Sequence, residues 1–338
     1  MKAGKEISYF TLCSQIGGGG FGQIWKVQNT EDDQYYAMKI ESLNSQRRTL
    51  NFETNILKKL RFSERFPKYI MDGQEDDFCF LVMELCGPNL YTIAQNLPSK
   101  RFNPAQMPIL FSELLTIMEQ FHSTGYIHRD IKPQNICTRF SGNTPLLLID
   151  YGVSKLFIDA NRQHIEARDH AAAIGSPLYS SPNTADHLEL SRRDDLYSLA
   201  YTILDLVGAQ LPWRGLPDPI ESGRLKKANP LSKLFAPYGD NYVEIGKQIE
   251  SLGYKDTPNY KQLRELAMRG SNLNNGNFEW MTATPKNPNF TKAAQNFGFN
   301  FDQNGFLLEL CPYMRPDRSS RSQNAPEGKK KEGKCIIC

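Results

Sequence analysis

A ten-residue stretch constrains this chain more than any other feature of its sequence. Residues 126–135 read Tyr-Ile-His-Arg-Asp-Ile-Lys-Pro-Gln-Asn, and the last six positions hold three different polar groups, Asp130, Lys132 and Asn135. An apolar run follows, and Asp-Tyr-Gly at residues 150–152 comes directly after it. Two such motifs, in this order and at this spacing, are hard to reach by chance. Any fold for this chain has to be compatible with both.

Bulk composition limits the classes of protein that fit. With 338 residues, the chain can bury a large core or divide into two lobes. The formal net charge of +3 is close to neutral, so composition does not indicate a nucleic-acid partner. Seven scattered cysteines and an N-terminus without an apolar segment favour free thiols in a reducing compartment, so we expect a cytoplasmic protein. No apolar run is long enough to span a bilayer.

The first part of the chain reads mainly as strands, and the following part mainly as helices. Helical spacing of apolar residues predicts a helix from Arg47 to Leu60. Asn103 before Pro104 predicts the start of a second helix, with Asn103 as its N-cap. The expected strands are Ile7 to Ile16, Gln23 to Gln28, Gln34 to Ile40, Tyr69 to Gly73 and Phe78 to Leu85. The expected long helices are Pro104 to Thr124 and Asp194 to Val207.

A glycine-rich segment separates the first two expected strands. It fits the pattern G-x-G-x-x-G-x-V, and the residues that we expect to contact a nucleotide are Ile16, Gly17, Gly19, Gly22 and Ile24. Glycine lets backbone N–H groups approach phosphates without a Cβ clash. Taken alone, the pattern also matches an ordinary glycine-rich hairpin turn.

Taken together, the motifs resemble those of protein kinases. Residues 128–135 are similar to the catalytic loop H-R-D-x-K-x-x-N, residues 150–152 to D-F-G with Tyr for Phe, and residues 36–39 to V-A-I-K. The resemblance implies an α+β, bilobal protein kinase fold: a small antiparallel-sheet N-lobe with one main helix, and a larger, mainly helical C-lobe. The expected parts are the N-lobe at 1–84, the C-lobe at 85–282, an extension docked on the C-lobe at 283–314 and a basic, disordered tail at 315–338.

The resemblance implies a role for each polar residue in transferring a phosphoryl group from ATP. Asp130 is the base, or orienting acceptor, for the substrate hydroxyl, and Lys132 neutralises the transferring group. Asn135 and Asp150 hold Mg²⁺, since their hard oxygen ligands suit a hard cation. Lys39 holds the α- and β-phosphates as a point charge.

Lys39 needs an anion to stay oriented, and two acidic residues are candidates. Glu53 lies in the helix that follows, so we expect a Lys39–Glu53 pair; Glu41, on the same strand as Lys39, is the rival. We also expect His128 and Arg129 to be structural, with Arg129 anchoring the activation segment. The remaining expectations are that Tyr151 packs under the helix bearing Glu53 and that Asp195 caps backbone N–H groups of the catalytic loop.

Further segments narrow the resemblance to the casein kinase I family. Residues 83–90 are similar to its hinge M-E-L-x-G-P-x-L, and residues 181–183, 191–196 and 211–216 also fit. The resemblance implies Ser/Thr substrates, because Lys follows the catalytic Asp by two residues, and it implies a monomeric kinase domain acting on proteins. The residues that it places around the adenine are Ala37, Met83 as gatekeeper, and the backbone of Glu84 and Cys86.

Two positions depart from the family pattern. Casein kinase I enzymes carry a basic cluster that receives an acidic or phosphorylated residue upstream of the target. Leu178 stands where the family has Arg, and Ala171 where it has Lys; Arg224 retains the third basic position. The two losses predict a weakened preference for substrates that are already phosphorylated.

The C-terminus ends in Cys-Ile-Ile-Cys at residues 335–338, which fits the prenylation pattern C-a-a-X with Cys335 as the modified residue. Lys329, Lys330, Lys331 and Lys334 would supply the second membrane signal that a single lipid requires. The expectation is therefore peripheral attachment to the cytoplasmic face of a membrane. A lone C-x-x-C half-site for zinc, a redox pair, a solvated tail and a nuclear-import patch remain alternatives.

Two other classes of function compete with an active protein kinase. One is a catalytically weak kinase-fold scaffold at a membrane; such proteins commonly lose at least one catalytic residue, and this chain has lost none of Lys39, Glu53, Asp130, Lys132, Asn135 and Asp150. The other is a small-molecule kinase, against which the peptide-side segments at 175–183 and 211–216 argue.

Overall fold

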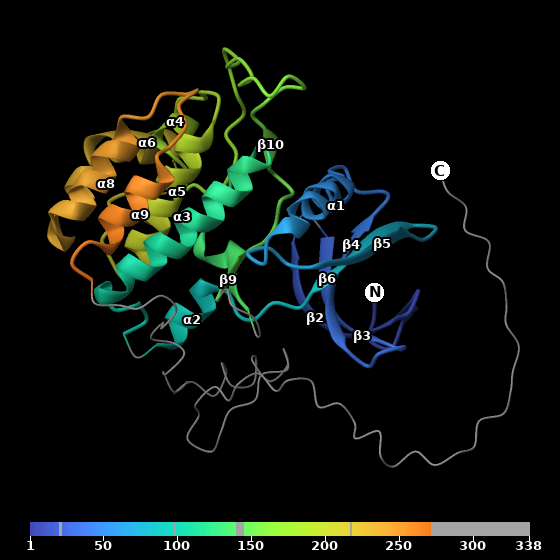
Figure 1. The fold of residues 1–338 in the computed structure, drawn as a ribbon. Coiled ribbons are helices and arrows are strands. Elements are labelled where there is room, and N and C mark those ends of the chain that lie inside the picture. Colours follow the sequence, from blue (N-terminus) through green and yellow to red (C-terminus); the bar gives the residue numbers. More distant parts are fainter. Residues whose placement is uncertain (20–21, 98, 140–144, 217, 272–338) are drawn as a thin grey trace, which may run out of the picture.

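A computed structural model gives the fold and describes residues 1–19, 22–97, 99–139, 145–216 and 218–271. The chain forms two lobes, an antiparallel sheet with helix α1 at one side and a group of helices at the other (Figure 1). The bilobal α+β fold that the resemblance implies is confirmed. The expectations for residues 272–338, which include the extension and the tail, lie outside the described residues.

The sheet lobe contains six strands in the order β1-β2-β3-β4-β6-β5, each antiparallel to its neighbour. Its strands are β1 (Glu6–Ile7), β2 (Phe10–Gly19), β3 (Gly22–Asn29), β4 (Tyr35–Ser42), β5 (Tyr69–Gln74) and β6 (Phe78–Glu84). Alternation in β3 buries Trp25 and Val27 against Met38 and Val82, because side chains of one strand point to opposite faces in turn.

Helix α1 (Leu50–Lys59) packs on β6 and β4 through Ile56 and Leu57. Its N-terminus is capped by a residue of the sheet: Glu41 Oε2 accepts hydrogen bonds from the backbone N–H of Thr49 and of Leu50, each at 2.9 Å. A carboxylate is favoured at this end because the first N–H groups of a helix lack partners within the helix. The cap fixes α1 relative to β4.

The helical lobe is built around α3 and α5, whose buried faces share one continuous apolar core. Its elements are α2 (Leu90–Asn96), α3 (Met107–Ser123), β7 (Tyr126–Ile127), β8 (Ile136–Thr138), β9 (Leu146–Leu148), β10 (Lys155–Leu156), α4 (Pro182–Ala185), α5 (Arg192–Leu206), α6 (Pro219–Ala228), α7 (Leu231–Phe235), α8 (Asp240–Glu250) and α9 (Tyr260–Met268). The 3₁₀ turns are η1 (Leu60–Phe62), η2 (Pro104–Gln106), η3 (Pro133–Asn135) and η4 (Ala236–Tyr238).

The starts of all three predicted helices differ from the sequence-based prediction, and α1 starts at Leu50, three residues after the predicted Arg47. Asn103 does cap, accepting from the N–H of Ala105 at 3.0 Å, but it caps the 3₁₀ turn η2, and the α-helix starts at Met107. Helix α5 starts at Arg192, before the predicted Asp194. The Asp194 carboxylate accepts from the N–H of Ser191 at 2.7 Å, and this capping box makes Ser191 the N-cap of the helix.

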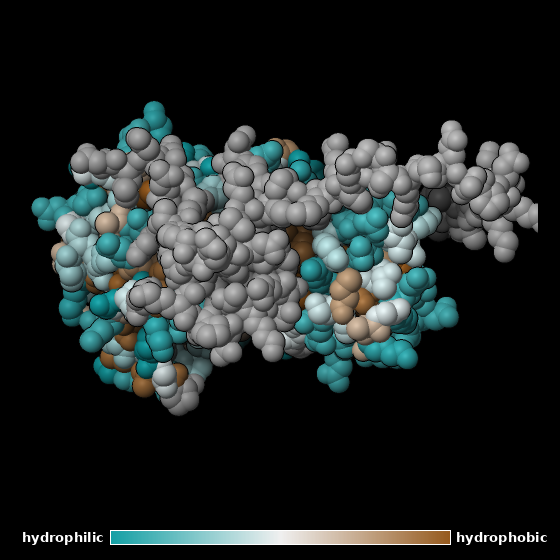
Figure 2. Space-filling view, turned by 90° about the horizontal axis from the view of Figure 1, so that it is seen from below, coloured by the Kyte–Doolittle hydropathy of each residue, from teal (hydrophilic) through white to brown (hydrophobic). Residues whose placement is uncertain are grey.

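The visible surface of both lobes carries mostly hydrophilic residues (Figure 2). Among the helices of the described residues, none combines the length and the apolar character needed to cross a bilayer.

Candidate active site

The loop between β7 and η3 is held in place by Asp195 of helix α5. The Asp195 carboxylate accepts from the backbone N–H of His128 at 2.7 Å and of Arg129 at 2.8 Å, and it lies 2.9 Å from His122 Nε2. Burial alone would raise the pKa of Asp195, but His122, His128 and the backbone donor outweigh burial and lower it. Asp195 therefore caps the catalytic loop, as the sequence predicts.

Both oxygens of Asp130 are oriented by neighbours. Oδ2 lies 2.6 Å from Lys132 Nζ, while Oδ1 accepts from the backbone N–H and the hydroxyl of Ser176 at 2.9 and 2.8 Å. Lys132 Nζ also donates to Ser176 Oγ at 3.1 Å. Gly175 permits this approach: its φ is +95°, and a Cβ there would lie 2.4 Å from the carbonyl oxygen of Arg129. The sequence analysis did not assign Ser176 to the site.

The ion pair predicted between Lys39 and Glu53 is present and extends to the other lobe. Lys39 Nζ lies 2.5 Å from Glu53 Oε2 and 3.2 Å from Asp150 Oδ1, and both Lys39 and Glu53 are buried. Glu41, the rival partner, caps α1. Burial opposes the charge of Lys39, but the carboxylates of Glu53 and Asp150 outweigh burial and raise its pKa. Lys39 also lowers the pKa of Asp150, against the effect of burial.

Asn135 and Asp150 are the residues whose side-chain oxygens would hold a metal ion. Asn135 Nδ2 donates to the Asp130 carbonyl at 2.9 Å, which leaves Asn135 Oδ1 as the free amide oxygen, and the Asp150 side chain is 36% exposed. Carboxylate and amide oxygens fit Mg²⁺, which keeps several waters and binds through few protein ligands plus phosphates. Within the described ranges, no cluster of three His, Cys, Asp or Glu residues could hold a metal by itself.

The hinge between the lobes is fixed by an arginine that the sequence analysis missed. Arg139 Nη2 and Nε contact the two carboxylate oxygens of Glu84 at 2.6 and 2.8 Å. The Glu84 N–H donates to the carbonyl of Lys68 at 2.8 Å. Both the side chain and the N–H of Glu84 therefore form contacts that hold the hinge in place. Arg139 lies 55 residues from Glu84 in the sequence, and no local pattern marks the pair.

The activation segment is tied to the catalytic loop and to β10. Arg129 Nε donates to the carbonyl of Val153 at 2.6 Å, which agrees with the anchoring role that we expected. Further along, the buried Glu189 carboxylate lies 2.7 Å from Lys155 Nζ and also pairs with Arg168. Tyr151 is buried and stacks on Phe121 of α3. The segment is thus held at several points by side chains of the chain itself.

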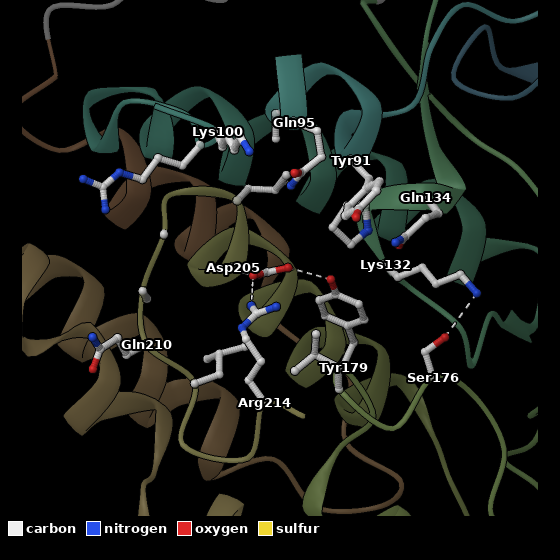
Figure 3. Close-up of a pocket in the computed structure, with 18 of the residues that line it drawn as sticks. Tyr91, Gln95, Lys100, Lys132, Gln134, Ser176, Tyr179, Asp205, Gln210 and Arg214 are labelled. Atoms are coloured by element: carbon white, nitrogen blue, oxygen red, sulfur yellow. Dashed lines mark hydrogen bonds and ion pairs between the residues drawn. The ribbon is translucent and has the colours of Figure 1, made fainter. Parts of the chain in front are cut away.

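A groove of about 1210 Å³ opens beside the catalytic loop, between α2 and the loop after α5 (Figure 3). Lys132, Asn135 and Ser176 line the end nearest the catalytic loop, and Leu178 and Tyr179 form part of its wall. Tyr179 donates its hydroxyl to Asp205 Oδ2 at 2.6 Å, and Arg214 pairs with the other oxygen of Asp205. The groove is large enough for an extended polypeptide to approach Asp130.

Comparison with known proteins agrees with this geometry. The protein kinase domain family matches residues 10–250 of the chain. This chain belongs to the protein kinase family. A probable serine/threonine-protein kinase of Dictyostelium discoideum is 30% identical over 259 residues, 76% of this chain and 52% of that protein, so this chain spans about half of its length. A probable casein kinase I homolog of Encephalitozoon cuniculi is 29% identical over 271 residues, 77% of this chain and 84% of that protein.

The residues at the three basic positions of the casein kinase I pattern lie in unlike surroundings. Leu178 packs against the apolar core of the large lobe, and Ala171 is buried. Arg224 is exposed, and its guanidinium contacts the carboxylate of Glu221 at 2.7 and 2.8 Å. The one cation retained from the pattern is thus already paired with a carboxylate on its own helix.

The Glu189 ion pairs should make stability depend on pH in acid. Burial alone raises the pKa of Glu189, but hydrogen bonds from Arg168 and Lys155 lower it from 4.5 to about 2. Because the pKa of Glu189 is lower in the folded state, its ion pairs stabilise the folded protein fully above about pH 4.5. This contribution to the free energy of unfolding is lost as the pH falls towards 2. Replacing Glu189 by Gln should lower the free energy of unfolding at pH 7 by on the order of 1–2 kcal/mol, a value that allows for solvent screening of both cations.

Urea unfolding at a series of pH values measures this effect. Between pH 4.5 and 2, the urea concentration at the unfolding midpoint should fall less in Glu189→Gln than in the unaltered protein. Glu166→Gln is the matched control, since the Glu166 side chain is 82% exposed in its pair with Lys255. Equal slopes for Glu189→Gln and the unaltered protein would contradict the assignment.

Proposed function

We propose that this chain is an ATP-dependent serine/threonine protein kinase of the casein kinase I type. The observation that carries the proposal is the convergence of Asp130, Lys132 and Ser176 at the end of a polypeptide-sized groove, with Lys39 and Asp150 paired above it. Asp130 and Lys132 come from the catalytic loop, Ser176 from the activation segment and Lys39 from β4, so the arrangement depends on the whole fold.

The acceptor hydroxyl would be oriented by Asp130. Its carboxylate accepts hydrogen bonds from Ser176 and Lys132, both of which line the groove. A serine or threonine hydroxyl entering beside Ser176 would donate to the same carboxylate and be turned towards the phosphoryl group. Lys132 would place its positive charge against the charge that develops in transfer. Little covalent work falls to the protein, so positioning and electrostatics supply the catalysis.

The nucleotide would lie between the lobes. Lys39 would hold its phosphates, while Asn135 and Asp150 would hold Mg²⁺, which neutralises phosphate charge when bound. The adenine would meet the hinge at Glu84 and Cys86, with Met83 and Ala37 beside it. The Glu84 N–H and side chain are engaged by Lys68 and Arg139, and the adenine would replace the Cys86 thiol, which lies 3.6 Å from the Glu84 carbonyl.

The choice of serine and threonine rests on Lys132 and on the relatives. Lys132 contacts both Asp130 and Ser176, so it stands directly at the acceptor position. The Dictyostelium and Encephalitozoon proteins carry serine/threonine and casein kinase I names, respectively. The hinge sequence at residues 83–90 supports the casein kinase I type.

Replacing Asp130 by Asn should abolish phosphoryl transfer to protein while leaving ATP binding largely intact. The change keeps shape but removes the charge that accepts the substrate proton, and losses of about 10²-fold or more follow from removing such a group. Transfer is measured with labelled ATP and a mixed-sequence peptide library, and binding with a fluorescent ATP analogue. Asp76→Asn, an exposed change in the small lobe, is the control. Undiminished turnover in Asp130→Asn would reject the assignment.

We also propose that this kinase has little preference for acceptors that carry an upstream phosphoserine. Leu178 packs on the core, Ala171 is buried, and Arg224 is paired with Glu221, so a phosphate would meet few free cations there. Each missing charge-assisted contact is worth about 1–3 kcal/mol. Peptide libraries with phosphoserine or serine fixed upstream should give rates within about tenfold of each other. Strong selection for phosphoserine three residues before the target would overturn this.

Attachment to membranes through Cys335 is a separate proposal, because residues 272–338 lie outside the described part. It rests on the C-a-a-X pattern and the neighbouring lysines. Cys335→Ser should shift the protein from the membrane to the soluble fraction in cells, while Cys311→Ser should not. A Cys335→Ser variant that remains on membranes would count against prenylation.

A further inference from the structure

Helix α6 carries a lysine that is buried without a carboxylate partner. Lys226 is only 3% exposed, and no described Asp or Glu lies within ion-pair distance of its Nζ. Its neighbour Lys227 behaves ordinarily: its side chain is 53% exposed and pairs with Asp186 at 2.5 Å. Burying an ammonium costs several kcal/mol unless polar groups compensate, so the surroundings of Lys226 need an explanation.

The compensation comes from the backbone of the activation segment. Lys226 Nζ donates to the carbonyl of Pro177 at 2.6 Å, to the carbonyl of Ser180 at 2.7 Å and to Ser180 Oγ at 3.3 Å. The ring centres of Trp213 and Tyr201 lie 5.5 and 5.7 Å from the same nitrogen. Carbonyl oxygens and aromatic faces both attract a cation. Burial nevertheless lowers the pKa of Lys226 to about 7, so the site tolerates the charge at a cost.

These carbonyls belong to the segment that forms the groove wall. Ser176, at its start, contacts Asp130 and Lys132, and Leu178 and Tyr179 line the groove. Lys226 does not line the groove, but it contacts the residues on either side of that pair. Trp213 also contacts this segment, since its Nε1 donates to the carbonyl of Leu178 at 2.9 Å. The segment is therefore held by side chains of α6 and of the loop after α5.

Helix α6 is itself fixed to the element that follows the segment. It packs on α4, and a Cβ added at Gly223 would lie 2.2 Å from the Cβ of Ala185. The anchor that Lys226 provides is thus closely packed, because α6 lies directly against α4 where Gly223 meets Ala185.

We propose that Lys226 is a positioning residue for the protein acceptor: by holding the carbonyls of Pro177 and Ser180, it keeps the groove wall in register with Asp130. The proposal rests on the proposed kinase function and adds to it a residue outside the nucleotide site and outside the groove lining. An apolar residue of similar volume would fill the same space, so the hydrogen bonds are what the lysine contributes beyond packing.

The test compares Lys226→Met with Lys227→Met in the full chain. Methionine keeps length and apolar volume but has no N–H donor. Hydrogen exchange should show faster exchange of amides at residues 176–181 in Lys226→Met than in Lys227→Met, with α3 and α5 unchanged in both. The KM for a peptide acceptor should rise on the order of tenfold in Lys226→Met, while the KM for ATP stays within about twofold.

The two readouts separate the possible failures. Unchanged exchange at residues 176–181 would overturn the positioning role, whatever the enzyme does. Faster exchange with an unchanged acceptor KM would overturn the link to acceptor binding, as would a rise in KM that is equal for peptide and ATP. If the unaltered protein transfers no phosphate to any peptide, the proposed kinase function fails, and the exchange experiment alone decides whether Lys226 holds the segment.

Discussion

The buried carboxylate of Asp195 is the contact on which the rest of the site depends. It accepts hydrogen bonds from two consecutive N–H groups of the catalytic loop, and so it ties that loop to α5 at the centre of the large lobe. The loop has no long strand or helix of its own to satisfy its backbone. Because Asp195 fixes the loop, Asp130 and Lys132 can face Ser176 at hydrogen-bond distance, and Arg129 can reach the carbonyl of Val153.

A second buried charge cluster relates the two lobes. Lys39 comes from the sheet, Glu53 from α1 and Asp150 from the large lobe, so their contacts join all three parts. The Glu41 cap holds the N-terminus of α1 to the strand that carries Lys39, so one strand supplies both the cation and the cap. A buried pair of this kind contributes little net stability but penalises any arrangement that leaves one partner alone. It therefore favours one relative placement of the lobes.

The sequence predicted contacts that family motifs mark, including the Asp195 cap, whose partners lie 67 and 66 residues away, and missed contacts that no motif marks. The strands, α1, the Lys39–Glu53 pair and the Asp195 cap follow from local spacing and from resemblance. Ser176, Arg139 and Lys226 were missed, because no motif or periodic pattern links them to their partners, which lie 46, 55 and 49 residues away. The shifted start of α3 has a different cause: proline fixes φ and removes a donor, which the 3₁₀ turn η2 accommodates as well as an α-helix.

The missed contacts of Ser176 and Lys226 share one physical reason. Residues 176–181 form neither strand nor helix, so most of their polar groups must find side-chain partners. Asp130, Lys226, Trp213 and Asp194 provide them, each from a different element, for the residues from Ser176 to Ser181. An irregular segment satisfied in this way has few alternative conformations, because shifting it would break several hydrogen bonds at once. Individual hydrogen bonds, rather than secondary structure, therefore hold the groove wall in one conformation.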